Sequence, residues 1–97
     1  MSRPTQMADR DVDAWLAHHE GWAREGTSAI MRAYTFPDFS SALAFVVRVG
    51  CLAEKKDHHP DIELGWGKVQ VRWMTHDAGG ITRLDVELAA ATDVLRS

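Results

Sequence analysis

Apolar positions recur along this chain with two different spacings, and each spacing predicts one kind of secondary structure. A repeat of three or four residues, which places apolar side chains on one face of a helix, occupies three segments: 9–20, 38–56 and 82–95. Alternation of apolar and polar residues, which is typical of a strand with one buried face, occupies four segments: 22–24, 29–36, 61–66 and 68–74. The predicted order is αββαββα.

This order predicts an α+β fold, in which helices pack on one face of a four-stranded antiparallel sheet. Local signals support the predicted boundaries. Asp38 can cap the second helix, because its carboxylate can accept a hydrogen bond from the first turn. Pro60 disfavours helix at the residue before it, so residues 57–60 are expected in a loop. Thr82 and Asp85 have the spacing of a capping box at the start of the third helix.

Composition bounds the kind of protein that these elements can form. A chain of 97 residues that is 45% hydrophobic can bury one modest core. We therefore expect a flexible N-terminal segment, 1–8, followed by a single domain, 9–97. No apolar run approaches the ~20 residues that span a membrane, and the N-terminus lacks the apolar core of a signal peptide. The single cysteine, Cys51, excludes an internal disulfide and fits a reducing compartment, so the expected location is the cytoplasm.

The net charge of the chain limits the classes of partner that it can bind. The formal net charge is −3, and the basic residues are scattered along the sequence. A nucleic-acid-binding surface needs clustered lysine and arginine to neutralise phosphates. We therefore expect neither a nucleic-acid partner nor a membrane partner.

Three histidines flank the second predicted hairpin. His58 and His59 precede its first strand, and His76 follows its second strand. Because these two ends of an antiparallel hairpin are neighbours, the three imidazoles can meet around one small molecule. Histidine has an ordinary pKa of about 6.5, so it is present in both protonation states near neutral pH. Such a pocket can supply an acid and a base without a metal. Glu54, Asp57 and Asp77 could orient an imidazole and favour its charged form.

Other interpretations of these residues stay open at this point. The histidines can be separate surface or capping residues. They can also form a zinc site with an open position, as catalytic zinc sites do, although adjacent residues rarely ligate one ion well. Asp85 fits a helix start better than a catalytic role. Trp66 and Trp73 are expected in the core or in an interface rather than against a substrate.

The wider spacing resembles the signature of the pterin-4a-carbinolamine dehydratases. The positions that carry the resemblance, with three, five, nine and eight residues between them, are Glu54, His58-His59-Pro60, Trp66, His76 and Asp85. The likeness extends upstream to Gly21-Trp22 and through the strand and helix within residues 29–49, and it also includes the segment 75–82. It covers about residues 12–95, which is nearly the whole chain.

The resemblance implies the family's αββαββα fold and its reaction, the metal-free dehydration of a 4a-hydroxytetrahydropterin (a 4a-carbinolamine) to the quinonoid dihydropterin. This reaction recycles a tetrahydrobiopterin-type cofactor. The resemblance implies that His58, His59 and His76 are catalytic, and we expect His59 to be the principal acid. It also implies substrate-binding residues and two supporting residues: Glu54, Asp57, Pro60, Thr75 and Asp77 for the substrate, with Trp66 and Asp85 as support. No bound cofactor and no metal are expected.

The family also suggests partners and alternatives. Its members assemble as homodimers or homotetramers, with sheets joined edge to edge in the dimer, and an aromatic amino acid hydroxylase is an expected pathway partner. The alternative function is a non-catalytic binding protein of the same fold, such as a transcription-factor dimerisation cofactor or a RuBisCO assembly factor. A metal-dependent hydrolase and a catalytically silent dimer are further alternatives. Assembly-factor relatives tend to lose the histidine pattern, so its retention here favours catalysis.

Overall fold

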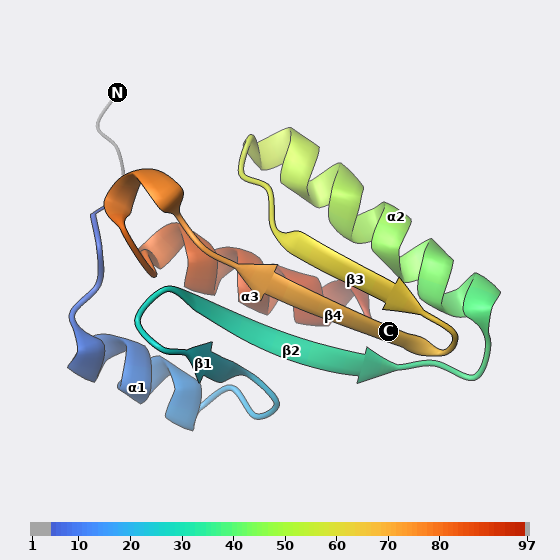
Figure 1. Ribbon diagram of the computed structural model, residues 1–97, viewed down its shortest axis with the longest axis horizontal. Coiled ribbons are helices and arrows are strands. Elements are labelled where there is room, and N and C mark those ends of the chain that lie inside the picture. Colours follow the sequence, from blue (N-terminus) through green and yellow to red (C-terminus); the bar gives the residue numbers. More distant parts are fainter. Residues whose placement is uncertain (1–4, 97) are drawn as a thin grey trace.

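Residues 5–96 form three α-helices and four β-strands in the predicted order, as a computed structural model describes them (Figure 1). The helices are α1 (Asp9–Ala17), α2 (Phe39–Lys56) and α3 (Arg83–Leu95). The strands are β1 (Ala23–Glu25), β2 (Ala29–Thr35), β3 (Asp61–Gly65) and β4 (Lys68–Trp73), and a short 3-10 helix, η1 (His76–Ala78), precedes α3. None of these described helices is both long and apolar enough to cross a membrane.

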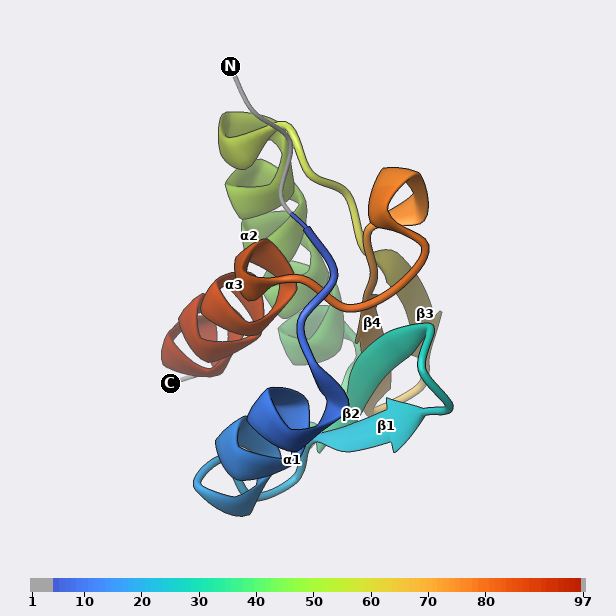
Figure 2. The ribbon, with the colours of Figure 1, turned by 90° about the vertical axis from the view of Figure 1, so that its left-hand side faces the viewer.

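The four strands form one antiparallel sheet in the order β1-β2-β4-β3, which confirms the predicted fold class. The central strands β2 and β4 pair Ile30 with Trp73 and Tyr34 with Val69. Paired residues in an antiparallel sheet point to the same face, and these four side chains are all buried. The polar side chains of β4 alternate with its buried ones and so point to the opposite face. No helix of residues 5–96 covers this face (Figure 2).

The helices lie on the apolar face of the sheet, as predicted. Figure 2 shows α2 and α3 side by side over this face, with α1 on the same side next to β1 and β2. The buried face of α2 consists of residues at helical spacing: Ala42, Phe45, Val49 and Ala53. Asp38 accepts a hydrogen bond from the Ser41 N–H at 2.7 Å, so the predicted cap is confirmed.

A polar anchor holds the C-terminal half of α3 against β2. Asp93 accepts hydrogen bonds from Trp22 Nε1 at 2.9 Å, from Arg32 Nη1 at 3.0 Å and from the Tyr34 hydroxyl at 2.5 Å. Burial and the hydrogen bond to Asp93 raise the pKa of Tyr34 above its ordinary value, so the hydroxyl remains a donor. This anchor fixes the axis of α3, and with it the position of the first turn of α3 beneath the end of β4.

Two boundaries differ from the prediction near the N-terminus. The first helix ends at Ala17 rather than at residue 20, because His19 folds back onto the helix end. Its Nδ1 lies 2.7 Å from the Trp15 carbonyl oxygen, and its ring stacks on the Trp15 ring at 3.8 Å. The first strand occupies residues 23–25 rather than 22–24, because the Trp22 side chain turns into the core.

The prediction that Trp66 belongs to the third strand was wrong, because β3 ends at Gly65. Its side chain is 75% exposed, so Trp66 does not lie in the core, and the expected interface position stays a prediction. The backbone explains this, because the tight β3–β4 turn passes through Gly67 at a φ of 65°. A side chain on Gly67 would collide with the Phe36 carbonyl oxygen, so the turn is fixed and Trp66 is left at its tip. Trp73, in contrast, is fully buried in the core as expected.

The N-terminal segment predicted to be flexible, 1–8, lies partly outside the described residues, which exclude 1–4 and 97. Gln6 pairs with Thr82 as an isolated antiparallel bridge. The Met7 N–H donates to the Ile81 carbonyl oxygen at 2.8 Å. These contacts lay the chain before α1 along the segment that leads into α3.

Candidate active site

The C-terminal end of α2 places the first two histidines. Asp57 ends the helix in the left-handed conformation, at a φ of 50°, which aspartate tolerates better than most residues. The chain reverses direction after Asp57, and a hydrogen bond of 3.1 Å from the His58 N–H to the Ala53 carbonyl oxygen stabilises this reversal. His58 and His59 therefore leave the helix end together and lead directly into β3.

The segment after β4 places the third histidine. The chain after β4 forms the 3-10 helix η1, which begins at His76. The Thr75 N–H donates to the Gly80 carbonyl oxygen, and the Gly79 N–H donates to the His76 carbonyl oxygen. Gly79 adopts a φ of 75°, which permits this tight closure. Because β3 and β4 are antiparallel, this turn lies beside the loop that carries His58 and His59.

The three histidines line one cavity, which we call the histidine cavity. Its volume is about 280 Å³, and its lining comes from the loop after α2 and from the segment after β4: Asp57, His58, His59, Met74, Thr75, His76 and Asp77. The structure therefore brings together the three histidines that were predicted to meet. Three of the predicted substrate-binding residues, Asp57, Thr75 and Asp77, lie in the same wall. Met74 also lines the cavity, although no sequence pattern predicted it there.

Asp85 lies beneath the histidine cavity and contacts one of its histidines. Its Oδ1 is 2.7 Å from Nε2 of His58. The Asp85 side chain is fully buried, and that of His58 is 13% exposed. On its other side, the His58 ring stacks against the Trp73 indole at a centroid distance of 5.8 Å and an interplanar angle of 6°. His58 is therefore held in one orientation by a carboxylate and an aromatic plane.

Hydrogen bonds from neighbouring groups satisfy the buried carboxylate of Asp85. Its Oδ2 accepts from the Thr75 hydroxyl at 2.8 Å and from the Thr82 N–H at 2.9 Å. A buried charge is tolerated only when it is paired and hydrogen-bonded, and these contacts meet that condition together with His58. The predicted role of Asp85 as a helix-start residue holds, because a capping box joins it to Thr82. The contact with His58 is an additional role that the capping pattern did not reveal.

His59 has a similar carboxylate partner in a very different environment. Its Nε2 lies 2.7 Å from Oε1 of Glu54, which belongs to the last turn of α2. The His59 side chain is 55% exposed and that of Glu54 is 81% exposed. A pair so open to water contributes little to stability. Its main physical effect is to orient the His59 ring at the mouth of the histidine cavity.

The pairs His58–Asp85 and His59–Glu54 determine which ring nitrogen of each histidine carries a proton. An ionised carboxylate can only accept hydrogen bonds, so each carboxylate accepts from the Nε2–H of its own histidine. This contact fixes which ring nitrogen carries the proton and leaves Nδ1 to accept or donate a proton. The site thus combines a shielded imidazole, His58, with a solvent-exposed imidazole, His59, and His76 opposite them. Within residues 5–96, no three His, Cys, Asp or Glu side chains are grouped so that they could hold a metal ion.

Besides Asp85, three of the predicted site residues do not line the histidine cavity. Pro60 connects His59 to the first residue of β3 and does not line the cavity. Trp66 lies at the turn between β3 and β4, whereas the histidines lie at the opposite, open end of this hairpin. Any supporting role of Trp66 must therefore be indirect. Glu54 also lies outside the lining and reaches the site through His59.

Comparison with known proteins places this geometry in context. The family profile described as pterin 4 alpha carbinolamine dehydratase matches residues 5–95. A protein of Roseiflexus sp. (strain RS-1), named provisionally as a pterin-4-alpha-carbinolamine dehydratase, is 44% identical over 92% of this chain and 95% of its own length. The crystal structure of a transcriptional coactivator/pterin dehydratase from Brucella melitensis superimposes with a TM-score of 0.89 at 31% identity, covering 96% of this chain and 100% of that chain.

A more distant structure shares the fold alone. It is a pterin dehydratase-like protein identified as a RuBisCO assembly factor in the alpha-carboxysome, with a TM-score of 0.68 and 22% identity. The match covers 82% of this chain and 94% of that chain. The same arrangement of helices and strands therefore occurs in a protein named for assembly and in proteins named for dehydration.

Proposed function

Because the chain belongs to the pterin-4a-carbinolamine dehydratase family, we propose that it dehydrates a 4a-hydroxytetrahydropterin to the quinonoid dihydropterin. The observation that carries the proposal is the single cavity lined by His58, His59 and His76. Family membership supports the class of reaction, and the cavity offers the acid and the base that this reaction needs. The proposed setting is the cytoplasm, where the product would be reduced again and returned to an aromatic amino acid hydroxylase.

The chemistry of the reaction explains why paired imidazoles suit it. The bond between C4a and its hydroxyl oxygen breaks, N5 loses a proton, and a double bond forms between C4a and N5. Hydroxide is a poor leaving group, so an imidazolium that protonates the hydroxyl allows water to leave instead. A second, neutral imidazole accepts the N5 proton. General acid–base catalysis of this kind is typically worth about 10²–10⁴-fold in rate.

The environments of the histidines suggest how they share these roles. We assign the acid to His59, because its exposed position beside Glu54 allows it to regain a proton from solvent after each turnover. His58 and His76 share the base and positioning roles. The rigid packing of His58 between Asp85 and Trp73 supports a positioning role for its ring. The flat, polar pterin ring would be bound by Asp57, Asp77 and backbone groups near Thr75, which line the same cavity.

The test is the decay of enzymatically generated 4a-hydroxytetrahydropterin, followed by ultraviolet absorbance with a chelator present. We expect the wild-type protein to accelerate the decay, and His59→Ala to lose about 10²-fold or more of that acceleration. His18→Ala is the matched control, because His18 is an exposed histidine at the end of α1, outside the cavity, and its loss should change nothing. Failure of the folded wild-type protein to accelerate the decay would refute the proposed activity.

A binding function is the second candidate, and the outer face of α2 supports it. Phe39, Leu43 and Val47 are exposed apolar residues spaced four apart, so they form a stripe on the helix side opposite the core. Burying this stripe against a second copy or another protein would be favourable. We propose that the protein forms a homodimer or homotetramer, and sedimentation equilibrium at micromolar concentration tests this. A monomer under those conditions would contradict self-association and leave the stripe to a different protein.

A further inference from the structure

A separate cavity lies at the N-terminal end of α2, whereas the histidine cavity lies at the C-terminal end of this helix. We call it the arginine cavity; its volume is about 290 Å³. Its lining comes from the residues after β2, the first half of α2 and the residue after α3: Phe36, Pro37, Ser41, Ala44, Arg48 and Arg96. The two cavities share no lining residue.

Arg48 is anchored at the end of α3. Its Nε and Nη2 donate to the Leu95 carbonyl oxygen at 3.2 and 3.1 Å. Leu95 is the last residue of α3, so its carbonyl oxygen has no partner within the helix, and a cation there also interacts favourably with the helix dipole. A guanidinium has five N–H donors, and this contact uses two of them. The contact therefore fixes the plane of the guanidinium and leaves its Nη1 group available to a ligand.

Arg96 is anchored at the end of β2. Its Nη2 donates to the Thr35 carbonyl oxygen at 2.7 Å, and its Cζ lies 4.3 Å from the centroid of the Phe36 ring. A guanidinium over an aromatic face is attracted by the electron density of the ring. Phe36 is itself held against Phe45 at a centroid distance of 5.2 Å. The Arg96 guanidinium is thus exposed at the surface but fixed in position.

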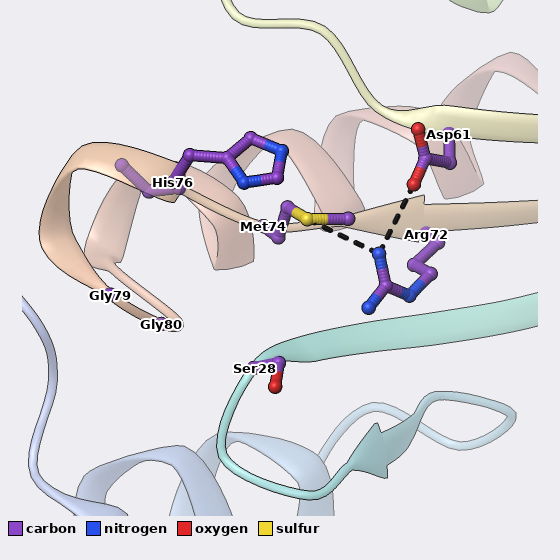
Figure 3. A pocket seen from close by; sticks show the side chains of 8 residues that line it. Ser28, Asp61, Arg72, Met74, His76, Gly79 and Gly80 are labelled. Carbon is purple, nitrogen blue, oxygen red and sulfur yellow. Dashed lines mark hydrogen bonds and ion pairs between the residues drawn. The ribbon is translucent and has the colours of Figure 1, made fainter.

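The charges of these two arginines are not neutralised by carboxylates. Arg72 illustrates the usual arrangement: Figure 3 shows its guanidinium bonded to Asp61, and Glu25 accepts two further hydrogen bonds from it. Arg48 and Arg96 instead contact carbonyl oxygens, and no carboxylate of residues 5–96 forms an ion pair with either of them. Two full positive charges therefore line one cavity.

The acidic residues closest in sequence to this lining have other partners. The Asp38 carboxylate accepts from the Ser41 N–H at 2.7 Å and from the Ser40 hydroxyl at 3.1 Å, and it does not line the cavity. Asp93, on the last turn of α3, is paired with Arg32. The arginine cavity therefore stays positive, although the whole chain has a formal net charge of −3.

Two guanidiniums that come from different elements favour a phosphate over a carboxylate. A carboxylate has two oxygens, and the fork of a single arginine occupies both of them. A phosphate monoester has three terminal oxygens and a charge of about −1.5 to −2 near pH 7, so it can accept from two arginines at once. The rest of the lining includes apolar surface that suits the organic side of a monoester: Phe36, Pro37 and Ala44.

We propose that the arginine cavity binds the phosphate group of a small phosphate monoester, and that Arg48 and Arg96 are the residues that hold the phosphate. Phe36 and Pro37 contact the organic group of the ligand. This site goes beyond the proposed dehydration and does not depend on it, because it lies at the other end of α2 from the histidines. The protein therefore has a second ligand site with its own chemistry.

The experiment measures binding of phenyl phosphate, inorganic phosphate and benzoate by calorimetry. The ionic strength is kept constant, because salt screens exposed charges. We expect phenyl phosphate to bind with a Kd of about 1 mM or below, since it makes charge-assisted contacts with both guanidiniums. Benzoate should bind about tenfold more weakly, because its carboxylate occupies only one of them. Inorganic phosphate should fall between the two, because it has no organic group to contact the apolar lining.

Chemical shifts in ¹H–¹⁵N spectra locate the bound ligand. The amide signals of Phe36, Ser41 and Ala44 should move as phenyl phosphate is added, together with the Nε–H signals of Arg48 and Arg96. The amide signals of the histidine cavity should stay where they are. Shifts at the histidines without shifts at the arginine cavity would overturn the proposal.

Four variants test the residues. Arg48→Ala and Arg96→Ala should each weaken the binding of phenyl phosphate by about tenfold or more, which is the loss expected for a charge-assisted contact. Arg48→Lys should weaken it less, because it keeps the charge and loses only the planar fork. Ala44→Glu should abolish binding, since it places a carboxylate in the cavity wall at an exposed position of α2 and leaves both arginine anchors in place.

Arg83→Ala is the matched control, because Arg83 is an exposed arginine on α3 that does not line the cavity. It should bind as the wild-type protein does. Wild-type affinity in folded Ala44→Glu, or absence of binding by the wild-type protein at about 10 mM phenyl phosphate, would overturn the proposal. If inorganic phosphate binds as tightly as phenyl phosphate, the phosphate site stands and the contact of Phe36 and Pro37 with an organic group is refuted.

Discussion

Replacement of Asp85 by asparagine tests whether this residue serves the site as well as the helix. The amide keeps the size of the carboxylate, and its oxygen can still accept from the Thr82 N–H and the Thr75 hydroxyl, now at 2.9 and 2.8 Å. Its NH₂ group then faces Nε2 of His58, so this nitrogen must become an acceptor. The ring proton moves to Nδ1, and His58 presents the opposite hydrogen-bonding pattern to the cavity.

The expected effects differ in size for stability and for activity. Hydrogen bonds to charged groups are worth about 1.5–3 kcal/mol, against about 0.5–1.5 kcal/mol for neutral ones. In Asp85→Asn the hydrogen bonds from Thr75 and Thr82 are retained but weakened, and the one with His58 is altered. We therefore expect the free energy of unfolding to fall by about 2 kcal/mol, from a typical total of about 5–15 kcal/mol. The protein stays folded at 25 °C. We expect kcat to fall by about 10- to 100-fold, because the change of tautomer removes part of an acid–base contribution of about 10²–10⁴-fold.

The assay pairs urea unfolding, followed by circular dichroism, with the dehydration rate at 25 °C. Thr92→Val is the matched control: Thr92 is a buried polar residue on the same helix that accepts from Trp73 Nε1 at 3.1 Å, and it does not contact the histidines. It should cost about 1–3 kcal/mol of stability with kcat unchanged. A kcat for Asp85→Asn within twofold of the wild-type value would show that Asp85 acts only as a helix cap, and the reasoning would be refuted.

Three further predictions concern the scaffold. Phe45→Ala should lower the free energy of unfolding in urea by about 3–5 kcal/mol, because Phe45 is fully buried against Tyr34 and Phe36; a loss under 1 kcal/mol would contradict this packing. Gly80→Ala should destabilise the protein by about 1–3 kcal/mol, because the added Cβ would collide with the Thr27 carbonyl oxygen. Gly50→Ala should stabilise it by up to about 1 kcal/mol, because Gly50 lies within α2 and a Cβ there would meet no atom within 4 Å. Asp38→Ala should destabilise the protein at pH 7, because the hydrogen bond from the Ser41 N–H lowers the pKa of Asp38. The contribution of Asp38 to stability is therefore fully present above its ordinary pKa of about 3.9, and it disappears as the pH falls through the lowered pKa. A mutational difference in stability that persists unchanged at pH 2 would argue against this assignment.

The fold could be predicted because its signals are local. The cap at Asp38, the apolar spacing through Phe45 and the alternation around Val69 each depend on residues a few positions apart. The same locality accounts for the failures. Trp66 has the apolar character of a strand residue, but the φ required at Gly67 decides that the chain turns there. No spacing rule indicates which side of such a turn faces the solvent.

The candidate site could be predicted only in part. The meeting of His58 and His76 follows from the antiparallel pairing of β3 and β4, which local patterns already indicate. The contact between His58 and Asp85 depends instead on how α3 crosses beneath the sheet, and it joins residues 27 positions apart. The resemblance to a family singled out Asp85, but a capping box with Thr82 is sufficient to explain an aspartate at this position. Because the capping role of Asp85 already explains its place in the sequence, the pattern gives no sign of its second role, the contact with His58.

The double duty of Asp85 has an evolutionary consequence. A lineage that abandoned catalysis would still be under selection to keep Asp85, because the start of α3 and the buried hydroxyl of Thr75 depend on it. Glu54 and His59 are exposed, support little of the fold, and are free to drift once turnover no longer matters. Among relatives of this chain, persistence of Asp85 therefore reports only that the domain folds. In a relative that does not need the proposed activity, we therefore expect Glu54 and His59 to be replaced before Asp85 is.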